Sequence, residues 1–194
     1  MPASRSPLAD LLADLRQALA GVGARWYLFG AQAAILHGAA RLTADVDITV
    51  DPGTRTAGDL AMALGAAGFE PRVDDVAAFA EANRVLPLVH ARTRIPVDVV
   101  LAGPGLEDLF FARAEQRPIG DVTVPVACAE DVVTMKVLAG RAKDLDDVAA
   151  ILRAQRWTLD LHRVRETLRQ IEQALDRSEL VAALERIVTR AGAR

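Results

Sequence analysis

Several features that would assign a protein to a special class are scarce in this sequence of 194 residues. A single cysteine, Cys128, excludes an internal disulfide framework and is typical of a reducing compartment. No apolar run approaches the roughly 18 residues that a transmembrane helix needs. The first twenty residues carry Asp10 and Asp14 within their apolar pattern, which is unlike a secretory signal peptide. We therefore expect a soluble, cytoplasmic protein with no membrane partner.

Aromatic residues are also scarce, at 4% of the chain, whereas hydrophobic residues of all kinds make up 52%. This hydrophobic content excludes global disorder, and it means that Ala, Leu and Val must fill the core. The length predicts one domain, or one domain with a small helical appendage. Within such a core we expect Cys128 to be a small buried residue rather than a nucleophile.

No strong charge of one sign is present, because the formal net charge is only −3. The charge is nevertheless uneven along the chain. Residues 1–152 hold 14 Lys and Arg against 20 Asp and Glu, whereas residues 153–194 hold 9 Arg against 6 acidic residues. The C-terminal part is therefore mildly basic, which permits contact with nucleic acid without demanding it.

Apolar periodicity and turn residues predict the secondary structure. Ser6 and Pro7 are typical of a helix start. Pro87 indicates that its strand lies at a sheet edge or begins late. We expect helices over residues 7–20, 31–37, 56–67, 75–82, 106–114, 131–140, 144–152, 160–175 and 178–191, and strands over residues 26–29, 45–51, 85–91, 95–101 and 121–127.

We expect the function to be organised around residues 26–51. A short apolar strand ends at Gly30, and a helix that ends at Gly38 follows directly. A glycine at the end of a strand lets a phosphate approach the backbone, and the start of the next helix favours an anion. This part of the chain therefore predicts a phosphate site.

Residues 45–51 alternate strictly between polar and apolar side chains, as in a strand with one buried face. Asp45 and Asp47 lie on the polar face, about 6.5 Å apart along the strand, so their carboxylates can converge on one divalent ion or on a pair. Mg²⁺ prefers hard oxygen ligands, and paired Mg²⁺ ions can hold the attacking and leaving oxygens of a phosphoryl transfer. A solvated acidic strand face would show the same pattern.

Asp98 stands between two valines in the apolar strand over residues 95–101. A buried unpaired carboxylate is costly, so Asp98 needs an ionic partner, a metal or an exposed face. If this strand pairs beside residues 45–50, three carboxylates meet at one site. The alternative is a solvated position or an ion pair with Arg92 or Arg94.

The second half of the candidate site lies on two successive helices. Lys136 projects from an otherwise apolar helix, where it can extend to water or donate to a triphosphate as a point charge. Asp144 and Asp147 follow in the run over residues 141–147 and, being three residues apart, share a helix face.

The order of these features resembles the polymerase-beta-like nucleotidyltransferase superfamily, and most of all its AbiEii-type members, which include abortive-infection and toxin–antitoxin toxins. The resemblance covers about residues 24–152. Residues 29–38 with Arg41, Thr43, Asp45 and Asp47 are similar to the family's first motif. Lys136 falls in a stretch like its third motif, and residues 141–147 look like its fourth.

The resemblance implies a role for each matching residue. Gly30 and Ala31 would cradle the nucleotide phosphates, and Lys136 would contact the triphosphate. Ala31 stands where the family usually has Gly or Ser, so a serine hydroxyl contact is missing. Arg41 and Thr43 would contact the nucleotide. Asp45 and Asp47 would bind Mg²⁺, with Asp98 as a third ligand or as the general base. Asp144 and Asp147 would orient Lys136, the nucleotide or the acceptor.

We therefore predict an α/β (α+β) fold with a small mixed sheet flanked by helices. Residues 1–152 would form the nucleotidyltransferase domain and residues 153–194 a helical region packed on it. The enzyme would use Mg²⁺, as one or two ions, to transfer NMP from an NTP to an acceptor hydroxyl. The resemblance implies two partners, a tRNA whose 3′ end is the acceptor and a cognate antitoxin. One alternative is an aminoglycoside or lincosamide as acceptor. The other alternative is a non-catalytic homologue that binds a nucleotide or a partner.

Overall fold

The computed structural model describes residues 5–103 and 105–192. Within them the chain divides into two compact units. Unit 1 contains the described residues of Met1–Gln32 and Thr43–Ala127, and unit 2 those of Ala33–Leu42 and Cys128–Arg194. This division differs from the expected boundary after residue 152. The reason is that the two helices before that boundary pack with the C-terminal helices and share their core.

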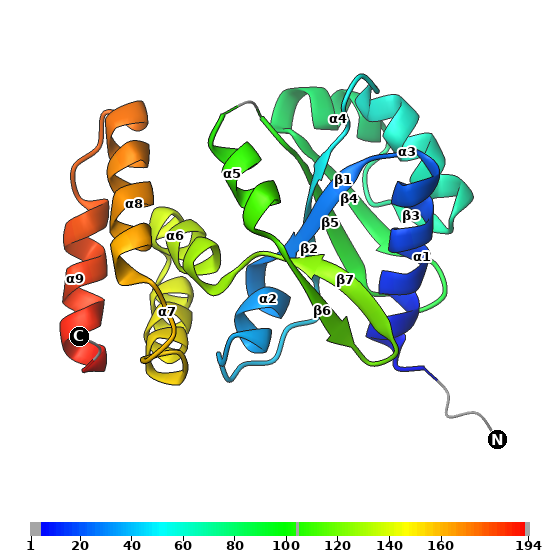
Figure 1. Ribbon diagram of the computed structural model, residues 1–194. Coiled ribbons are helices and arrows are strands. Elements are labelled where there is room, and N and C mark those ends of the chain that lie inside the picture. The colour runs from blue at the N-terminus through cyan, green and yellow to red at the C-terminus, as the bar shows by residue number, and fades with distance from the viewer. Residues whose placement is uncertain (1–4, 104, 193–194) are drawn as a thin grey trace. The chain divides into compact units, whose positions relative to one another are not determined.

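Unit 1 holds the sheet and most of the shorter helices (Figure 1). Its elements are α1 (Pro7–Gly21), β1 (Arg25–Phe29), the start of α2 (Gly30–Leu36), β2 (Val46–Asp51), α3 (Ala57–Ala66), β3 (Phe69–Pro71), α4 (Val76–Asn83), β4 (Val85–His90), β5 (Pro96–Leu101), α5 (Leu106–Arg113), β6 (Glu115–Ile119) and β7 (Val122–Val126). Helix α2 continues into unit 2, which also holds α6 (Ala129–Ala139), α7 (Ala142–Ala154), α8 (Leu161–Leu175) and α9 (Leu180–Ala191).

The described strands form one mixed sheet in the order β3-β4-β5-β2-β1-β7-β6. Strand β2 pairs antiparallel with β1 and parallel with β5, and β4 and β5 form the expected antiparallel hairpin. The predicted α/β class and mixed sheet are therefore confirmed, and the Asp98 strand does pair beside the Asp47 strand.

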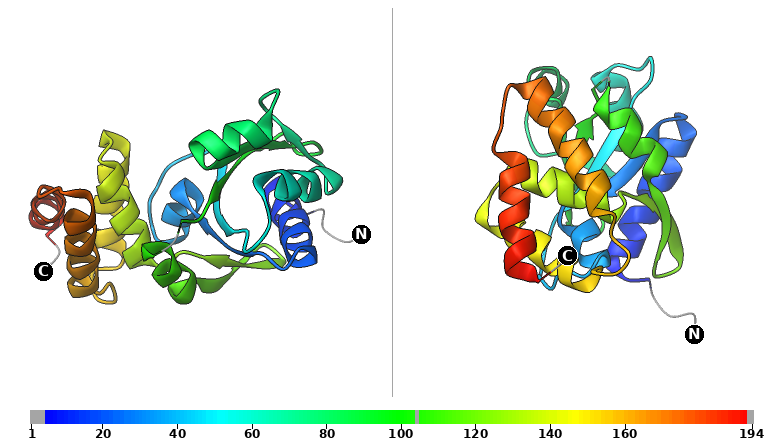
Figure 2. Two further views of the ribbon diagram at one scale, coloured as in Figure 1. Left: turned by 90° about the horizontal axis from the view of Figure 1, so that it is seen from above. Right: turned by 60° about the vertical axis from the view of Figure 1, so that its left-hand side comes forward.

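The two faces of the sheet have different covers. Val46, Ile48 and Val50 are fully buried on one face, and α1 and α3 lie side by side against unit 1's sheet (Figure 2). On the other face Tyr27 packs edge-on against Phe111 of α5, with ring centroids 5.0 Å apart. Thr49, opposite Tyr27 in the register, is consequently buried despite its place in the polar alternation.

Local signals account for several helix boundaries. The Ser6 hydroxyl accepts a hydrogen bond from the Ala9 amide and so caps α1 as expected. Thr56 and Asp59 form a reciprocal capping box at the start of α3. Asp75 caps α4 by accepting from the Ala78 amide. These caps satisfy backbone N–H groups that would otherwise have no partner in the first helical turn.

Two strands were not predicted, and the expected edge position of Pro87 was wrong. β3 has only three residues and β6 contains a proline, so neither shows a strand pattern. Strand β4 lies between β3 and β5. The Pro87 carbonyl accepts from the Arg72 amide beyond the end of β3, at 2.9 Å. The N–H and C=O of one strand residue point to the same side of the strand. The N–H that Pro87 lacks would therefore lie beyond the end of β3, so the proline removes no hydrogen bond between β3 and β4.

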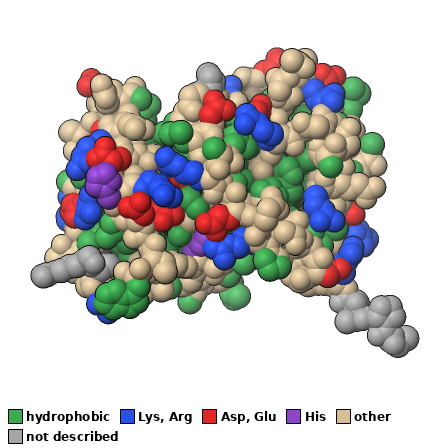
Figure 3. Space-filling model, viewed as in Figure 1, with side chains coloured by type: hydrophobic (Ala, Val, Ile, Leu, Met, Phe, Trp, Pro, Cys, Tyr) green, Lys and Arg blue, Asp and Glu red, His purple; other side chains and the backbone are tan. Residues whose placement is uncertain are grey.

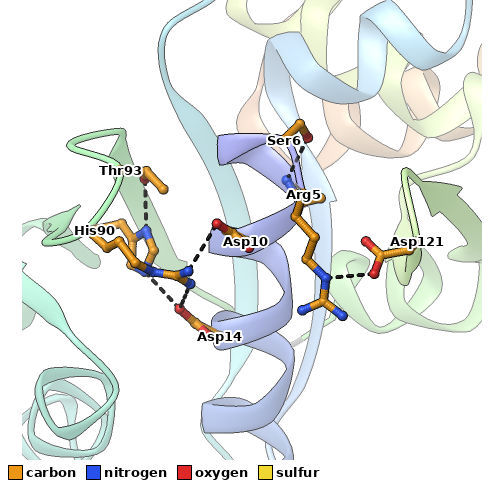
Figure 4. A network of polar contacts seen from close by, with 9 residues as sticks. Arg5, Ser6, Asp10, Asp14, His90, Thr93 and Asp121 are labelled. Carbon is orange, nitrogen blue, oxygen red and sulfur yellow. Dashed lines mark hydrogen bonds and ion pairs between the residues drawn. The ribbon is translucent and has the colours of Figure 1, made fainter. Parts of the chain in front are cut away.

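A polar network ties α1 to the hairpin of unit 1 (Figure 4). The buried His90 ring lies between Asp14, at 3.0 Å from Nε2, and the Thr93 hydroxyl, at 2.8 Å from Nδ1. Arg92 donates to both Asp10 and Asp14. His90 is thus a structural histidine with both ring nitrogens satisfied.

Unit 2 is built from helices that bury one apolar face each. α6 packs on α7 and α8, and α9 packs on α7 and α8. The strongly amphipathic α8 and α9 contribute Val164, Leu168, Leu184 and Ile187 to this core. The predicted C-terminal helical pair is confirmed. None of the helices in the described residues is long and apolar enough to cross a membrane.

Candidate active site

Asp47 and Asp98 lie side by side in unit 1. They are direct partners in the parallel register of β2 and β5, and each is partly exposed. Neighbouring strands are about 4.8 Å apart, and partners in a parallel register point to the same face. The Asp47 and Asp98 carboxylates therefore lie on the same face of the sheet. This is the face on which α5 packs against Tyr27, but α5 does not cover the two carboxylates.

Gly30 makes room for the carboxylate of Asp47. Its φ is +64°, and a Cβ added there would lie 2.0 Å from Asp47 Oδ2. Phe29 is the register partner of Asp47, so the turn from β1 into α2 passes directly over this carboxylate. Gly30, which we expected to let a phosphate approach the backbone, lies against the Asp47 carboxylate instead. Any side chain at position 30 would displace that carboxylate.

The other predicted site residues of unit 1 surround this pair in sequence. Asp45 precedes β2 rather than lying in it, is exposed, and accepts a hydrogen bond from the Thr43 hydroxyl. The Gln32 amide approaches the Asp45 carbonyl at 3.4 Å. Ala31 is a buried residue in the first turn of α2, where it has no hydroxyl to offer.

Arg72 is a site residue that the sequence analysis missed. Its Nη2 forms an ion pair with Asp98 Oδ1, and its Nε donates to the Leu88 carbonyl at 2.9 Å. The expected partners Arg92 and Arg94 instead bind α1 and Glu70. No local pattern marks Arg72, because its contact with Asp98 depends on the strand order β3-β4-β5.

The donor set of unit 1 is chemically suited to a divalent cation. Asp45, Asp47 and Asp98 offer the carboxylate oxygens that Mg²⁺ prefers, and Asp47 and Asp98 are both partly exposed. The three are not gathered around one point: across residues 5–103 and 105–192, no cluster of three or more Asp, Glu, His or Cys side chains has the geometry of a metal site. Asp98 is also held by Arg72.

Lys136 is the centre of a charged cluster inside unit 2. Its Nζ donates to Asp144 Oδ1 at 3.1 Å and to Asp147 Oδ2 at 2.7 Å, and the lysine is only 5% exposed. Both aspartates are also buried. The prediction that Asp144 and Asp147 share a helix face is confirmed, and that face holds the lysine.

Two arginines complete the cluster. Arg41 donates to Asp147 Oδ2 at 2.9 Å, and Arg141 pairs with Asp144. Three cations and two carboxylates thus form one connected cluster. Burial acts to raise the pKa of Asp144, but hydrogen bonds from Arg141 and Lys136 outweigh it and hold the pKa below its usual range.

The predicted site residues fall into two groups, one in each unit. Unit 1 holds Gly30, Ala31, Thr43, Asp45, Asp47 and Asp98, and unit 2 holds Arg41, Lys136, Asp144 and Asp147.

Cys128 and His37 belong to unit 2 and are both buried. Burial raises the pKa of the Cys128 thiol well above its usual range, and the nearby Asp131 carboxylate adds to the effect. A thiol with a raised pKa is a poor nucleophile, which agrees with the structural role expected for this residue.

Comparison with known proteins identifies the family. Residues 13–192 match the family model described as "Nucleotidyl transferase AbiEii toxin, Type IV TA system", whereas no curated protein matches the chain. Among solved structures, the antibiotic-resistance factor ANT(2″)-Ia is similar at a TM-score of 0.60 and 15% identity, covering 92% of this chain and 95% of that one.

Two further structures share the fold. A nucleotidyltransferase-like protein from Paracoccidioides brasiliensis has a TM-score of 0.52 at 17% identity, covering 92% of this chain and 90% of its own. The lincosamide antibiotic adenylyltransferase LnuA, bound to lincomycin, has a TM-score of 0.50 at 12% identity, covering 73% and 94%. On the family match over nearly the whole chain and on this shared fold, the protein is a nucleotidyltransferase that belongs to the AbiEii toxin family.

Proposed function

We propose that this enzyme transfers a nucleoside monophosphate from an NTP to a hydroxyl at the 3′ end of an RNA such as tRNA, and that it does so in the cytoplasm with Mg²⁺. The observation that carries the proposal is the adjacent Asp47 and Asp98 on parallel strands, with Gly30 shaped around the first carboxylate. The acceptor oxygen would bond to the α-phosphorus of the NTP, and the bond from that phosphorus to the bridging oxygen would break and release pyrophosphate.

The carboxylates of unit 1 would hold the metal. Asp47 and Asp98, with Asp45, are the residues that would bind one or two Mg²⁺ ions. When bound, Mg²⁺ neutralises charge that develops on the phosphate oxygens. Arg72 engages only Oδ1 of Asp98, so Oδ2 would remain to accept the proton of the acceptor hydroxyl. Backbone N–H groups of Gly30 and Ala31, and the Thr43 hydroxyl, would contact phosphates.

Unit 2 would supply the cationic contacts to the triphosphate. Asp144 and Asp147 fix the position of the Lys136 ammonium, and Arg41 reaches the same Asp147 oxygen. A positioned cation needs little reorganisation when charge develops on a phosphate, which is why such preorganisation is effective. The three cationic side chains of this cluster support a role in binding an anion.

The acceptor has a second candidate, a small cationic antibiotic. The antibiotic-modifying enzymes among the structural relatives favour this reading, as does the acidic balance of residues 1–152. The type IV toxin family favours a cognate antitoxin, and the basic balance of residues 153–194 favours the RNA acceptor. A protein that binds NTP without turnover is the third possibility, and Ala31, which has no hydroxyl, is the residue that supports it.

Label transfer tests the proposal. The protein is incubated with Mg²⁺, each α-³²P NTP in turn and total tRNA, and labelled RNA is resolved on a gel. Asp47→Asn should abolish labelling, because it removes one carboxylate charge with little change of shape. Asp51→Asn, on the same strand and face but paired with Arg25, is the matched control and should retain labelling.

Each other result points to a different function. Pyrophosphate release only when an aminoglycoside or lincosamide is added would move the acceptor to a small molecule. NTP binding without product under either condition would contradict catalysis.

A further inference from the structure

Trp157 lies in the connection between α7 and α8 of unit 2 and is 84% exposed. Such exposure is unusual, because tryptophan is highly buried on average. The Arg156 guanidinium lies over the indole ring, with Cζ 4.4 Å from the ring centroid. This contact presents an aromatic face and a cation together at the surface.

Other arginines near the ends of α7 and α9 also have no carboxylate partner. Most arginines of the protein are in ion pairs, for example Arg163, Arg165, Arg169 and Arg177 on or next to α8. By contrast, Arg153 and Arg156 at the end of α7, and Arg190 at the end of α9, are exposed and pair with no acidic group in residues 5–103 or 105–192. Their charge is therefore available to an external anion.

These residues belong to one end of unit 2. α7 packs against α9, and both views in which they can be followed place their C-terminal ends at the same end of the unit (Figures 1 and 2). On α8, by contrast, Arg163, Arg165 and Arg169 are each in an ion pair, and basic and acidic side chains gather together on this part of unit 2 in the space-filling view (Figure 3). We call Arg153, Arg156, Trp157 and Arg190 the arginine–tryptophan surface.

We propose that the arginine–tryptophan surface binds single-stranded RNA, with one base stacked on Trp157 and the adjoining phosphates held by the arginines. Base stacking on an exposed aromatic residue beside cations is the common chemistry of single-strand recognition. The proposal rests on the proposed RNA acceptor and adds to it a second contact surface in unit 2. A purely apolar protein partner fits less well, because the Arg156 guanidinium covers the indole ring and the surface carries two further arginines without carboxylate partners.

Tryptophan fluorescence makes the test specific. The chain has two tryptophans, and Trp26 is buried in unit 1, so quenching by added RNA reports on Trp157. A single-stranded 12-nucleotide RNA should quench emission, whereas inorganic polyphosphate, which has charge but no bases, should not. Equal quenching by polyphosphate would overturn the stacking contact.

Affinity for the same fluorescein-labelled RNA gives a second measure. Trp157→Ala should weaken binding about 5- to 150-fold, the usual range for one stacked base. Arg156→Gln should reduce the slope of log affinity against log salt by about 0.7, because one fewer counterion is released from a single strand. Leu175→Ala, which removes another exposed large apolar side chain from unit 2, is the matched control and should bind as wild type.

The test separates this surface from the proposed function. RNA affinity unchanged in Trp157→Ala overturns the surface, even if label transfer to RNA succeeds. A second outcome is that Trp157→Ala loses RNA affinity while the wild-type protein transfers no label to RNA. That outcome would support the arginine–tryptophan surface and contradict the proposed RNA acceptor. Circular dichroism and the unfolding midpoint of each variant confirm that the fold is retained.

Discussion

The two groups of predicted site residues, one in each unit, hold their charges in opposite ways. In unit 1, Asp98 and its partner Arg72 have side chains that are 39% and 37% exposed. In unit 2, the Lys136, Asp144 and Asp147 side chains are all less than a tenth exposed. Exposed pairs contribute little to stability and can exchange partners, whereas buried groups must stay paired. We infer that the sheet site can accept new ligands, while the helical cluster is also a structural element of its unit.

The largest expected effect is the loss of the buried lysine. Lys136→Ala leaves two buried carboxylates without their shared donor and should lower the free energy of unfolding by about 3–5 kcal/mol. Urea unfolding followed by circular dichroism measures this. Lys143→Ala, on an exposed position of α7, is the control and should change stability by less than about 0.5 kcal/mol. If Lys136→Ala left the free energy of unfolding unchanged, the buried cluster of unit 2 would be no more important for stability than the exposed ion pair of unit 1.

The next effect concerns the space beside Asp47. Gly30→Ala should reduce label transfer by about 100-fold, because the new Cβ collides with the carboxylate and a displacement of about 1 Å is enough for such a loss. Gly23→Ala is the matched control, since Gly23 has a similar φ of +67° but open space around it. Both variants should carry a backbone cost of about 1–2 kcal/mol, and only Gly30→Ala should lose activity. Equal activity in the two would show that Asp47 has no catalytic role.

The contribution of the buried Asp144 to stability should depend on pH. The pKa of Asp144 is lowered in the folded protein, so its contribution is present above the ordinary value of 3.8 and is lost as the pH falls through the folded value. The stability difference between wild type and Asp144→Asn should therefore shrink as the pH falls below the ordinary pKa of 3.8. Asp146→Asn, an exposed change on the same helix, is the control for the loss of one charge. A difference that grows toward acid pH would contradict the direction of the shift.

The smallest expected effect is on the exposed pair of unit 1. Arg72→Gln should lower the free energy of unfolding by less than about 1 kcal/mol, because solvent screens an ion pair that is more than a third exposed. Chemical denaturation under the conditions used for Lys136→Ala gives a direct comparison. A loss as large as that of Lys136→Ala would mean that the charged groups of both units are structural.

The sequence determined much of the fold through local patterns. Apolar periodicity predicted α1, α8 and α9, and strict alternation predicted β2, because these elements bury one face against a core. Ser6 and Asp75 marked helix starts through their own side-chain hydrogen bonds. The spacing of Asp144 and Asp147 was sufficient to predict a shared helix face.

Only the tertiary structure decided which charged groups meet. Arg72 reaches Asp98 across β4, and Arg41 reaches Asp147 from a position 106 residues away in the chain. The short β3 and the proline-containing β6 form by pairing with neighbours rather than by their own propensity. Local sequence patterns report backbone preference and burial, which act over a few residues. The partner of a charge depends on strand order and helix packing, and these are properties of the folded chain.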